Sequence, residues 1–483
     1  MGQIAAVISR TDTDVSDTVR RMLERASPCQ GDAYGLSSEM GARTSAKIPM
    51  IPHASSMLGH KLFKARSEDP AQPLGQYGYT TAFEGRVWRS SDIPDAEAIT
   101  EALGPEPRRG ALDLIGQNCS LAFALLDRGR LLCARDTLGL VPLYIGGDEE
   151  RSVVASNRKM LWAAGIEARA IQPGHVFDIS EVDMKSEPVR TLSQPPPIHP
   201  SMEDAVEALD GLLSTAVEAR CRGVHRVAIG FSGGIDSSLL AYYADRAGAN
   251  VDLICVGMEG TRGFEAAERA ADALDLPLRL EAFTADDVED DLDTVLWSVE
   301  ESDPMKVGVG LPTYWAARSA TETGHRIFIS GNCADEVFGG YQKYAREYAS
   351  GSGSVNESMY RDVASSHEVN FERDYKICSD LGLELRLPFA DVEVVRYGLS
   401  LPVELKLSKA ATSPRKLVLR ALARQKGFTE ELAEMPKKAV QYSTGVNRAL
   451  QRMAKAEGKS LRVYIAERFE EVKERNLGET SDR

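Results

Sequence analysis

The sequence predicts an α/β protein with two domains. Its 483 residues exceed the roughly 100 to 200 residues of one typical domain. Short apolar runs separated by turn residues fill the first part, whereas strand-like and helix-like segments alternate in the second. Four prolines within residues 195–200 separate the two parts, and such a stretch forms neither a helix nor a central strand. We therefore predict domains at residues 1–190 and 204–483, joined by a linker at residues 191–203.

The first domain is predicted to be rich in antiparallel strands. Apolar runs bounded by Gly or Asp turns predict strands, and apolar residues at the helical period predict helices. The predicted strands are residues 4–9, 121–127, 131–135, 140–145 and 152–155, and the predicted helices are residues 15–26 and 95–103. We expect these elements to form a layered domain of sheets and helices.

The second domain is predicted to hold a parallel sheet, because its strands alternate with helices. The predicted strands are residues 226–232, 251–257 and 326–330, and the predicted helices are residues 202–221, 239–247 and 264–273. From residue 364 onward the pattern is helical. It ends in a charged helix at residues 461–477, whose apolar positions favour a packing or dimer contact over a membrane contact.

The amino-acid composition indicates which classes of partner the protein can bind and which compartment suits it. Lys and Arg number 57 and Asp and Glu number 72, so the net charge is −15, and an acidic surface repels nucleic-acid phosphates. The seven cysteines include no CxxC pair, which argues against a structural zinc site and favours a reducing compartment. No apolar run reaches the about 18 residues that a membrane span needs. We expect a cytoplasmic protein that binds small molecules, with nucleic acid unlikely and no membrane.

The segment that carries the chemistry is Phe-Ser-Gly-Gly-Ile-Asp-Ser-Ser at residues 231–238. It lies between a predicted strand and a predicted helix, where glycines let an anion approach and free helix amides point at it. It does not follow the Walker pattern GxxxxGK[ST]. Asp236 would repel a phosphate unless a cation such as Mg²⁺ lies between them. A pyrophosphate cradle with Mg²⁺ is therefore predicted; the alternative is an ordinary glycine turn with a capped helix.

The Ser-Gly-Gly-Ile-Asp-Ser-Ser segment resembles the signature of the N-type ATP pyrophosphatases, which cleave ATP to AMP and pyrophosphate. The whole chain resembles the asparagine synthetase family, because further segments similar to that family's follow in its order, at residues 134–144, 330–341 and 383–391. The resemblance implies an Ntn-hydrolase-like αββα sandwich with a glutamine-amidotransferase-like fold. It further implies an adenine-nucleotide α-hydrolase-like parallel α/β domain with a helical C-terminal part.

The resemblance also implies an ATP and Mg²⁺ site. Asp236 and Asp335 would hold Mg²⁺ with the pyrophosphate, and Lys416 is a further phosphate candidate. In the amide-forming step a lysine would neutralise developing charge; we prefer Lys438 to Lys437, although both could form a solvated pair. The residues implied to bind ATP are Ser232, Gly233, Gly234, Asp236, Ser237, Ser238, Val256, Met258 and Gly331.

Departures from the family in the first domain predict that glutaminase activity is lost. Glutamine-hydrolysing members place a cysteine nucleophile after the initiator Met, and this chain has Gly2, which offers no nucleophile. The family's Arg-Gly-Pro-Asp segment is Gln-Gly-Asp at residues 30–32, and its Asn-Gly-Glu segment is Glu84-Gly85-Arg86. The loss resembles that of the β-lactam and carbapenam synthetases.

A further departure concerns amide formation. Where asparagine synthetases carry Glu and β-lactam-forming relatives carry Tyr, this chain has Asn332, and an amide is no general base near neutral pH. Glu372 and Asp374 are candidates for the base, unless they form a surface ion pair. Asn332 could instead bind a different substrate. Cys333 is expected to be a small buried thiol rather than a nucleophile.

These features together predict an asparagine-synthetase-like, ATP-dependent amide ligase that forms an acyl-adenylate without hydrolysing glutamine itself. Aspartate and ammonia are the simplest substrate pair. The alternatives are an amide- or lactam-forming ligase on another carboxylate, a tRNA-nucleoside-adenylating enzyme, and a non-catalytic ATP-binding partner protein. A homodimer and a separate glutaminase are compatible with all that the sequence contains.

Overall fold

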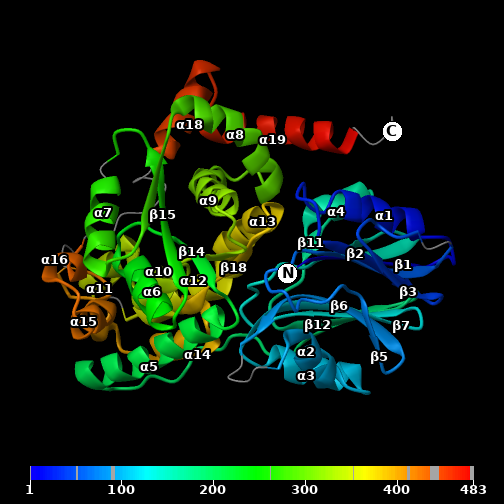
Figure 1. Cartoon of the computed structure of the whole chain (residues 1–483), viewed down its shortest axis with the longest axis horizontal. Coiled ribbons are helices and arrows are strands. Elements are labelled where there is room, and N and C mark those ends of the chain that lie inside the picture. Colours follow the sequence, from blue (N-terminus) through cyan, green and yellow to red (C-terminus); the bar gives the residue numbers. More distant parts are fainter. Residues whose placement is uncertain are drawn as a thin grey trace. The chain divides into compact units, whose positions relative to one another are not determined.

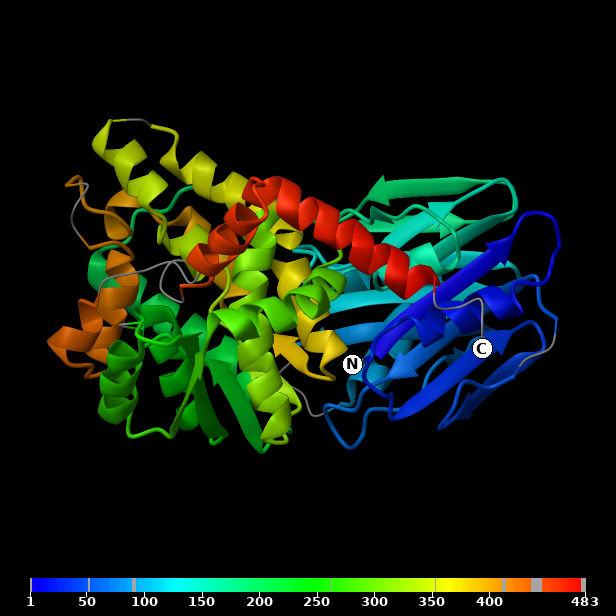
Figure 2. The ribbon, with the colours of Figure 1, turned by 90° about the horizontal axis from the view of Figure 1, so that it is seen from above.

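The computed structural model describes residues 2–50, 53–88, 93–261, 263–351, 353–410, 414–435 and 445–478. The chain divides into two compact units (Figures 1 and 2). The first unit contains Met1–Leu192 together with Ser379–Glu384 and Asn476–Arg483. The second contains Ser193–Cys378 and Leu385–Arg475. The division after Leu192 therefore falls at the start of the proline-rich stretch.

The first unit is built from two antiparallel sheets. One has the strand order β11-β9-β10-β1-β4-β2-β3 and the other the order β13-β12-β8-β7-β6-β5. The first sheet contains β1 (Gly2–Ser9), β2 (Ala33–Ser38), β3 (Gly41–Ser45), β4 (Ser56–Leu62), β9 (Tyr144–Gly147), β10 (Arg151–Ala155) and β11 (Arg169–Ala170). The second contains β5 (Leu74–Gln76), β6 (Tyr79–Val87), β7 (Cys119–Asp127), β8 (Arg130–Arg135), β12 (His175–Ile179) and β13 (Met184–Pro188).

Helices cover the outer faces of both sheets. The helices α1 (Ser16–Glu24) and α4 (Arg158–Ala163) pack on the first sheet, and α2 (Asp95–Leu103) and α3 (Pro107–Ile115) pack on the second. Figure 1 shows these two helix pairs on opposite sides of the unit. The sheets contact each other through β1 and β6. The αββα sandwich that the resemblance implies is thereby confirmed.

One predicted strand of the first unit begins later than expected. Residues 140–145 were expected to be extended, yet β9 begins at Tyr144. The amides of Leu140 and Val141 donate to the buried carboxylate of Asp136, with N–O distances of 3.0 and 3.4 Å. These hydrogen bonds hold the residues after Asp136 in a turn. A carboxylate that accepts hydrogen bonds from several nearby amides takes the place of the backbone hydrogen bonds of a strand.

The second unit holds a parallel sheet with the strand order β16-β15-β14-β17-β18. Strands β14 and β15, β14 and β17, and β15 and β16 pair in parallel. The strands are β14 (Arg226–Gly230), β15 (Asn250–Met258), β16 (Leu278–Phe283), β17 (Ile327–Ile329) and β18 (Glu384–Arg386). The predicted parallel α/β organisation is confirmed.

Helices enclose this sheet. The helices α6 (Ile235–Arg246) and α7 (Gly263–Leu274) contact β15, and α9 (Pro304–Glu322) contacts it as well. Figure 1 shows α7 and α9 on different sides of β15. Around them lie α5 (Met202–Cys221), α8 (Ala285–Val299), α10 (Ala334–Phe338), α11 (Gln342–Ala349), α12 (Val355–Ser366), α13 (Glu372–Asp380), α14 (Val392–Ser400), α15 (Leu417–Gln425), α16 (Glu430–Ala433), α18 (Val446–Ala456) and α19 (Leu461–Gly478).

The prediction that everything after residue 364 is helical was wrong at one place. Strand β18 lies at the edge of the parallel sheet, and the amide of Ser330 donates to the carbonyl of Arg386 at 3.1 Å. Three residues are too few to show a strand period, so only pairing with β17 makes this segment a strand. In the described part of the chain, no helix combines the length and the apolarity needed to cross a membrane.

Candidate active site

The predicted phosphate loop follows β14 directly and leads into α6. The amide of Phe231 donates to the carbonyl of Ile254 at 2.8 Å, which continues the pairing of β14 with β15. The next turn passes through Gly233, whose φ is +69°. A Cβ atom on Gly233 would lie 2.5 Å from the carbonyl oxygen of Ala266. The turn therefore requires glycine both for its left-handed backbone and for the close approach of α7.

The serines of the loop have different environments. Ser232 is exposed, and its hydroxyl accepts from the amide of Gly234 at 3.3 Å. The hydroxyl of Ser237 donates to the carbonyl of Gly234 at 3.1 Å and so closes the first turn of α6. Ser238 is fully buried, and its hydroxyl has no hydrogen-bond partner among the described residues. Ser232 and the first amides of α6 are therefore the groups of this loop best placed to meet an anion.

Two carboxylates from different elements converge on one ammonium group. The Nζ atom of Lys416 lies 2.5 Å from Oδ2 of Asp236, at the start of α6, and 2.6 Å from Oδ1 of Asp335, in the first turn of α10. Lys416 is buried, whereas the two aspartates keep 15% and 16% of their side chains exposed. A Cβ atom on Gly340 would lie 1.8 Å from Asp335 Oδ1, so that glycine makes room for the carboxylate.

The carboxylates of Asp236 and Asp335 are also suitable ligands for Mg²⁺. Mg²⁺ is commonly held by one or two carboxylates while substrate phosphates and water complete its shell. Asp236 and Asp335 meet this description, because they share one cation position next to the phosphate loop. No group of three or more His, Cys, Asp or Glu that could hold a metal occurs within the described residues. Mg²⁺ held by these two carboxylates would take phosphate oxygens and water as its further ligands.

The remaining predicted ATP contacts lie on neighbouring strand ends. A Cβ atom on Gly331, which follows β17, would lie 3.3 Å from the Cβ of Asp236. Val256 and Met258 are half-buried at the end of β15. Carboxyl ends of parallel strands share one edge of a sheet. Gly331, Val256 and Met258 therefore lie at the same edge of the sheet as the predicted phosphate loop. A contact with ATP remains a prediction for each of the three residues.

The predicted catalytic lysines, Lys437 and Lys438, lie outside the described residues. The two ends of their segment are described. The carbonyl of Met435 accepts from Arg420 at 3.1 Å, and a Cβ atom on Gly445 would lie 3.3 Å from the Cβ of Met258. Both ends are thus anchored in the second unit, and the roles of the two lysines stay predictions.

Asn332 is paired with Asp374 rather than with Glu372. Its Nδ2 atom lies 2.5 Å from Oδ2 of Asp374 on α13. Asp374 and Glu372 are both buried, so the expectation of a surface ion pair was wrong. Arg373 donates to Asp374 Oδ1 at 2.6 Å, and the hydroxyl of Thr313 lies 3.4 Å from the same oxygen. Neither Thr313 nor Arg373 was predicted to take part in this site. Thr313 lies on α9, and only tertiary packing brings it next to Asp374 on α13.

Cys333 has the character of a structural thiol. It is buried and adopts a left-handed backbone with φ of +79° before α10. Burial raises the pKa of the Cys333 thiol well above its ordinary value, and Glu336 adds to the effect. A thiol of this kind carries little thiolate, as expected for a buried residue in a position where the family has glycine.

In the first unit, Gly2 lies against a buried histidine. Gly2 begins β1 and pairs with the neighbouring strand β4, which contains His60. A Cβ atom on Gly2 would lie 2.2 Å from the imidazole ring of His60. His60 is fully buried, and burial lowers its pKa to about 3. A larger side chain at position 2 therefore requires the imidazole to move.

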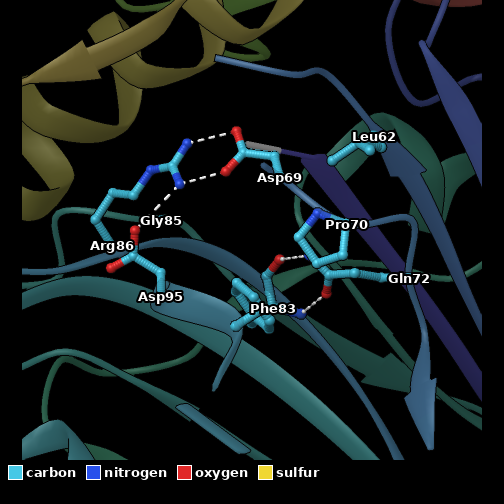
Figure 3. A pocket seen from close by; sticks show the side chains of 9 residues that line it. Leu62, Asp69, Pro70, Gln72, Phe83, Gly85, Arg86 and Asp95 are labelled. Atoms are coloured by element: carbon cyan, nitrogen blue, oxygen red, sulfur yellow. Dashed lines mark hydrogen bonds and ion pairs between the residues drawn. The ribbon is translucent and has the colours of Figure 1, made fainter. Parts of the chain in front are cut away.

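Arg86 lines a small cavity in the same unit (Figure 3). Its guanidinium forms ion pairs with Asp69 at 2.5 Å, with Asp95 at 3.2 Å and with Glu384 at 2.8 Å. Figure 3 shows the Arg86 side chain between Asp69 and Asp95, with dashed lines to both. Nearby acids raise the pKa of the buried Arg86 despite the opposing effect of burial. The position where the family has the Glu of Asn-Gly-Glu thus holds a cation paired within the protein.

Comparison with known proteins agrees with this architecture. The family model for asparagine synthase matches residues 208–354 and 344–478, and the model for a glutamine amidotransferase domain matches residues 68–163. The chain belongs to the asparagine synthase family. The resemblance found in the motifs is thereby confirmed, and membership makes the chain an enzyme of the ATP-dependent ligase class.

The asparagine synthase relatives cover different shares of the chain. A relative from Methanocaldococcus jannaschii, named for glutamine-hydrolysing asparagine synthetase, is 32% identical over 70% of this chain and 71% of its own length. Asparagine synthetases of Triphysaria versicolor and Sandersonia aurantiaca are 30% and 29% identical over 60% of this chain. The matches span 51% and 57% of those plant proteins, so the chain covers about half of their length.

A solved glutamine phosphoribosylpyrophosphate amidotransferase from B. subtilis matches with a TM-score of 0.32 and 15% identity. The match covers 58% of this chain and 65% of that protein. A score this low carries no argument about fold or function.

Proposed function

We propose that this chain activates a carboxylate with ATP and joins it to nitrogen, with aspartate and ammonia as the substrate pair. One observation carries the proposal. The carboxylates of Asp236 and Asp335 reach a single ammonium at 2.5 and 2.6 Å, beside a glycine loop that opens a helix. An anion cradle with an adjoining cation position is what a pyrophosphate leaving group needs.

The proposed reaction has two steps. A carboxylate oxygen of the substrate attacks the α-phosphorus of ATP, the bond to the bridging oxygen breaks, and pyrophosphate leaves with that electron pair. The nitrogen lone pair then attacks the acyl carbon, the bond between that carbon and the AMP oxygen breaks, and AMP leaves with that electron pair while nitrogen gives one proton to solvent water. The products are an amide, AMP and pyrophosphate.

Each part of the second unit has a separate task in this scheme. The loop at residues 231–234 and the first turn of α6 bind phosphate through backbone amides and Ser232. Asp236 and Asp335 would hold Mg²⁺, which neutralises charge on the departing pyrophosphate when bound. Lys416 bridges the two carboxylates in the structure, and its ammonium would leave that position when Mg²⁺ binds between them. Val256 and Met258 line the neighbouring strand end, where the adenine would lie.

We also propose that the first unit hydrolyses no glutamine. Gly2 provides no nucleophile, and the imidazole of His60 occupies the space beside it. Arg86 pairs with Asp69, Asp95 and Glu384 instead of presenting a carboxylate to a substrate amine. Ammonia would then come from solution or from a separate glutaminase. A homodimer remains a prediction as well.

A second candidate is an amide- or lactam-forming ligase on another carboxylate. Asn332 favours it, because an amide stands where the family's asparagine-forming members carry Glu. Asn332 is half-buried and tied to Asp374, so it can contact a substrate without taking its proton. The choice of carboxylate separates the two candidates.

The test measures pyrophosphate release from Mg-ATP with aspartate, with ammonium or glutamine as the nitrogen source. We expect aspartate-dependent pyrophosphate and asparagine with ammonium, and neither glutamate nor asparagine with glutamine. Asp335→Asn should lower the rate by about 100-fold or more. The matched control is Asp291→Asn, a carboxylate of α8 that pairs with Trp315 and Arg318. Pyrophosphate with a different carboxylate only would support the second candidate.

A further inference from the structure

Lys416 lies directly before α15 in a left-handed backbone conformation, with φ of +60°. A residue other than glycine loses free energy in this conformation, which persists only where the surrounding structure holds it. The residue before it, Arg415, pairs with Leu407 in an isolated antiparallel bridge. The residue after it, Leu417, donates its amide to the carbonyl of Lys406 at 3.0 Å. Both neighbours of Lys416 are therefore tied to the same segment of the chain.

A buried arginine holds this turn at Lys416 through a further hydrogen bond. Arg420 lies one helical turn further along α15, and its Nε atom donates to the carbonyl of Arg415 at 2.6 Å. Its Nη1 and Nη2 atoms donate to the carbonyls of Ala433 and Met435 at 2.5 and 3.1 Å. The guanidinium thus joins the Lys416 turn to the end of α16 through three main-chain carbonyls.

The donors of Arg420 bind main-chain carbonyls rather than a carboxylate. Arg420 is buried, and its Nη1 atom lies 4.0 Å from the carboxylate of Glu434, farther than from the carbonyl that this atom binds. Burial lowers the pKa of Arg420, whereas Glu434 and Asp236 act in the opposite direction. An arginine in a protein stays protonated even so. Because its charge also acts on Asp236, a test of the hydrogen bonds has to keep that charge.

We propose that Arg420 is a positioning residue for phosphate binding at the ATP site. It fixes the Lys416 turn, so that the Lys416 ammonium can exchange the carboxylates of Asp236 and Asp335 for the phosphates of ATP. The inference rests on the proposed function and adds the residue that keeps this lysine within reach of the phosphates. Arg420 acts through Lys416 and does not itself need to contact ATP.

The variant Arg420→Lys keeps the positive charge and removes the planar set of donors. A lysine carries its donors on a single nitrogen, so it cannot bind the carbonyls of Arg415, Ala433 and Met435 together. The Lys416 turn then loses one of its supports, and we expect the Kd for MgATP to rise about tenfold. The Kd for AMP should stay unchanged, because AMP lacks the β- and γ-phosphates. A general loss of structure would weaken the binding of both nucleotides.

Isothermal titration calorimetry on the full chain measures both affinities, and Tm is recorded for each variant. The matched control is Arg424→Lys on the same helix, where the guanidinium pairs with Glu430 at 2.8 Å and with Glu434. This control loses contacts between α15 and α16 but leaves the hydrogen bonds of Arg420 in place, so its Kd for MgATP should not change. Lys416→Met should raise this Kd about as much as Arg420→Lys does. Adding Arg420→Lys to Lys416→Met should have no further effect.

The outcomes separate this inference from the proposed function on which it rests. A lack of MgATP binding by the unmodified protein would overturn both. Binding of MgATP without carboxylate-dependent exchange of labelled pyrophosphate into ATP would overturn the proposed function alone. An unchanged Kd for MgATP in Arg420→Lys would overturn the inference alone.

The inference would also be overturned by results that give Arg420 a different role. Equal losses of MgATP and AMP binding would make Arg420 a structural residue, and additive effects in the double variant would show that it acts independently of Lys416. If Arg420→Lys does not unfold cooperatively, Arg420→Gln replaces it, because glutamine removes the buried charge and keeps a donor. Failure of both variants to fold would show that Arg420 serves the fold itself.

Discussion

The ammonium group of Lys416 lies 2.6 Å from the carboxylate of Asp335. The same ammonium reaches Asp236 at 2.5 Å, so one buried lysine balances two acids that begin separate helices. Like charges this close destabilise each other when the cation between them is removed. The arrangement makes the folded second unit dependent on a positive charge at this position, whether it belongs to lysine or to a bound ion.

Replacing Lys416 tests this dependence. Lys416→Met should lower the free energy of unfolding by about 2 kcal/mol, because two facing carboxylates lose their counter-charge. Mg²⁺ should restore stability by binding the folded state, so its effect on Tm should be larger in the variant than in the original protein. The matched control is Lys306→Met, which removes an ion pair of 2.5 Å to Glu301 away from the site. Equal shifts by Mg²⁺ in both variants would contradict the shared cation position.

Gly233 should tolerate no side chain. Gly233→Ala combines a left-handed backbone with a Cβ position 2.5 Å from a carbonyl oxygen, and we expect a loss of about 2–3 kcal/mol in the free energy of unfolding. Gly248→Ala is the control, because its φ is +81° but no atom lies within 4 Å of its Cβ position. Gly248→Ala should lower the free energy of unfolding by about 1 kcal/mol, which is the cost of the left-handed backbone alone. Chemical denaturation measures the free energy of unfolding of both variants. Equal losses in the two variants would show that the close contact with Ala266 does not destabilise Gly233→Ala.

Restoring a cysteine at position 2 should not restore glutaminase activity. Gly2→Cys places a Cβ atom 2.2 Å from the His60 ring, and Arg86 still occupies the position of the family's Glu. We expect no glutamate release from glutamine and a lower Tm. Gly75→Cys is the control, since nothing lies within 4 Å of its Cβ position in the same unit. Glutamate release by Gly2→Cys would overturn the proposed loss of function in this unit.

His60 predicts a pH dependence of stability in the first unit. Its pKa is about 3 when folded, against 6.5 for an ordinary histidine, so the unfolded chain binds a proton below pH 6.5 and the folded chain does not. This stabilising difference is fully present above pH 6.5 and is lost as pH falls toward 3. Between pH 6.5 and 5 it amounts to about 2 kcal/mol.

The measurement compares urea unfolding of the original protein and His60→Gln at both pH values. The original protein should lose about 2 kcal/mol more than the variant on acidification. His53→Gln is the control, because that histidine keeps 86% of its side chain exposed. An equal loss in all three proteins would show that His60 does not carry the effect.

Much of the fold could be predicted because its periodic patterns are local. The helices at residues 95–103 and 202–221 were predicted with the bounds that the structure has, since each shows several turns of apolar periodicity. Strand β18 was missed because three residues show no period. Strand β9 began late because the side chain of Asp136 competes with the strand ladder for nearby amides, and side-chain hydrogen bonds do not appear in an apolar pattern.

The sequence by itself determined the fold class and the family, and it predicted the phosphate loop, because these depend on residues that are neighbours in the chain. Only the tertiary structure decided which side chains meet. Lys416 contacts Asp236, which lies 180 residues away in the sequence. Asn332 pairs with Asp374, 42 residues away, and not with Glu372. Such pairs depend on how helices pack against the ends of a sheet, and their energies come from burial and distance. Neither quantity can be read from the order of residues along the chain.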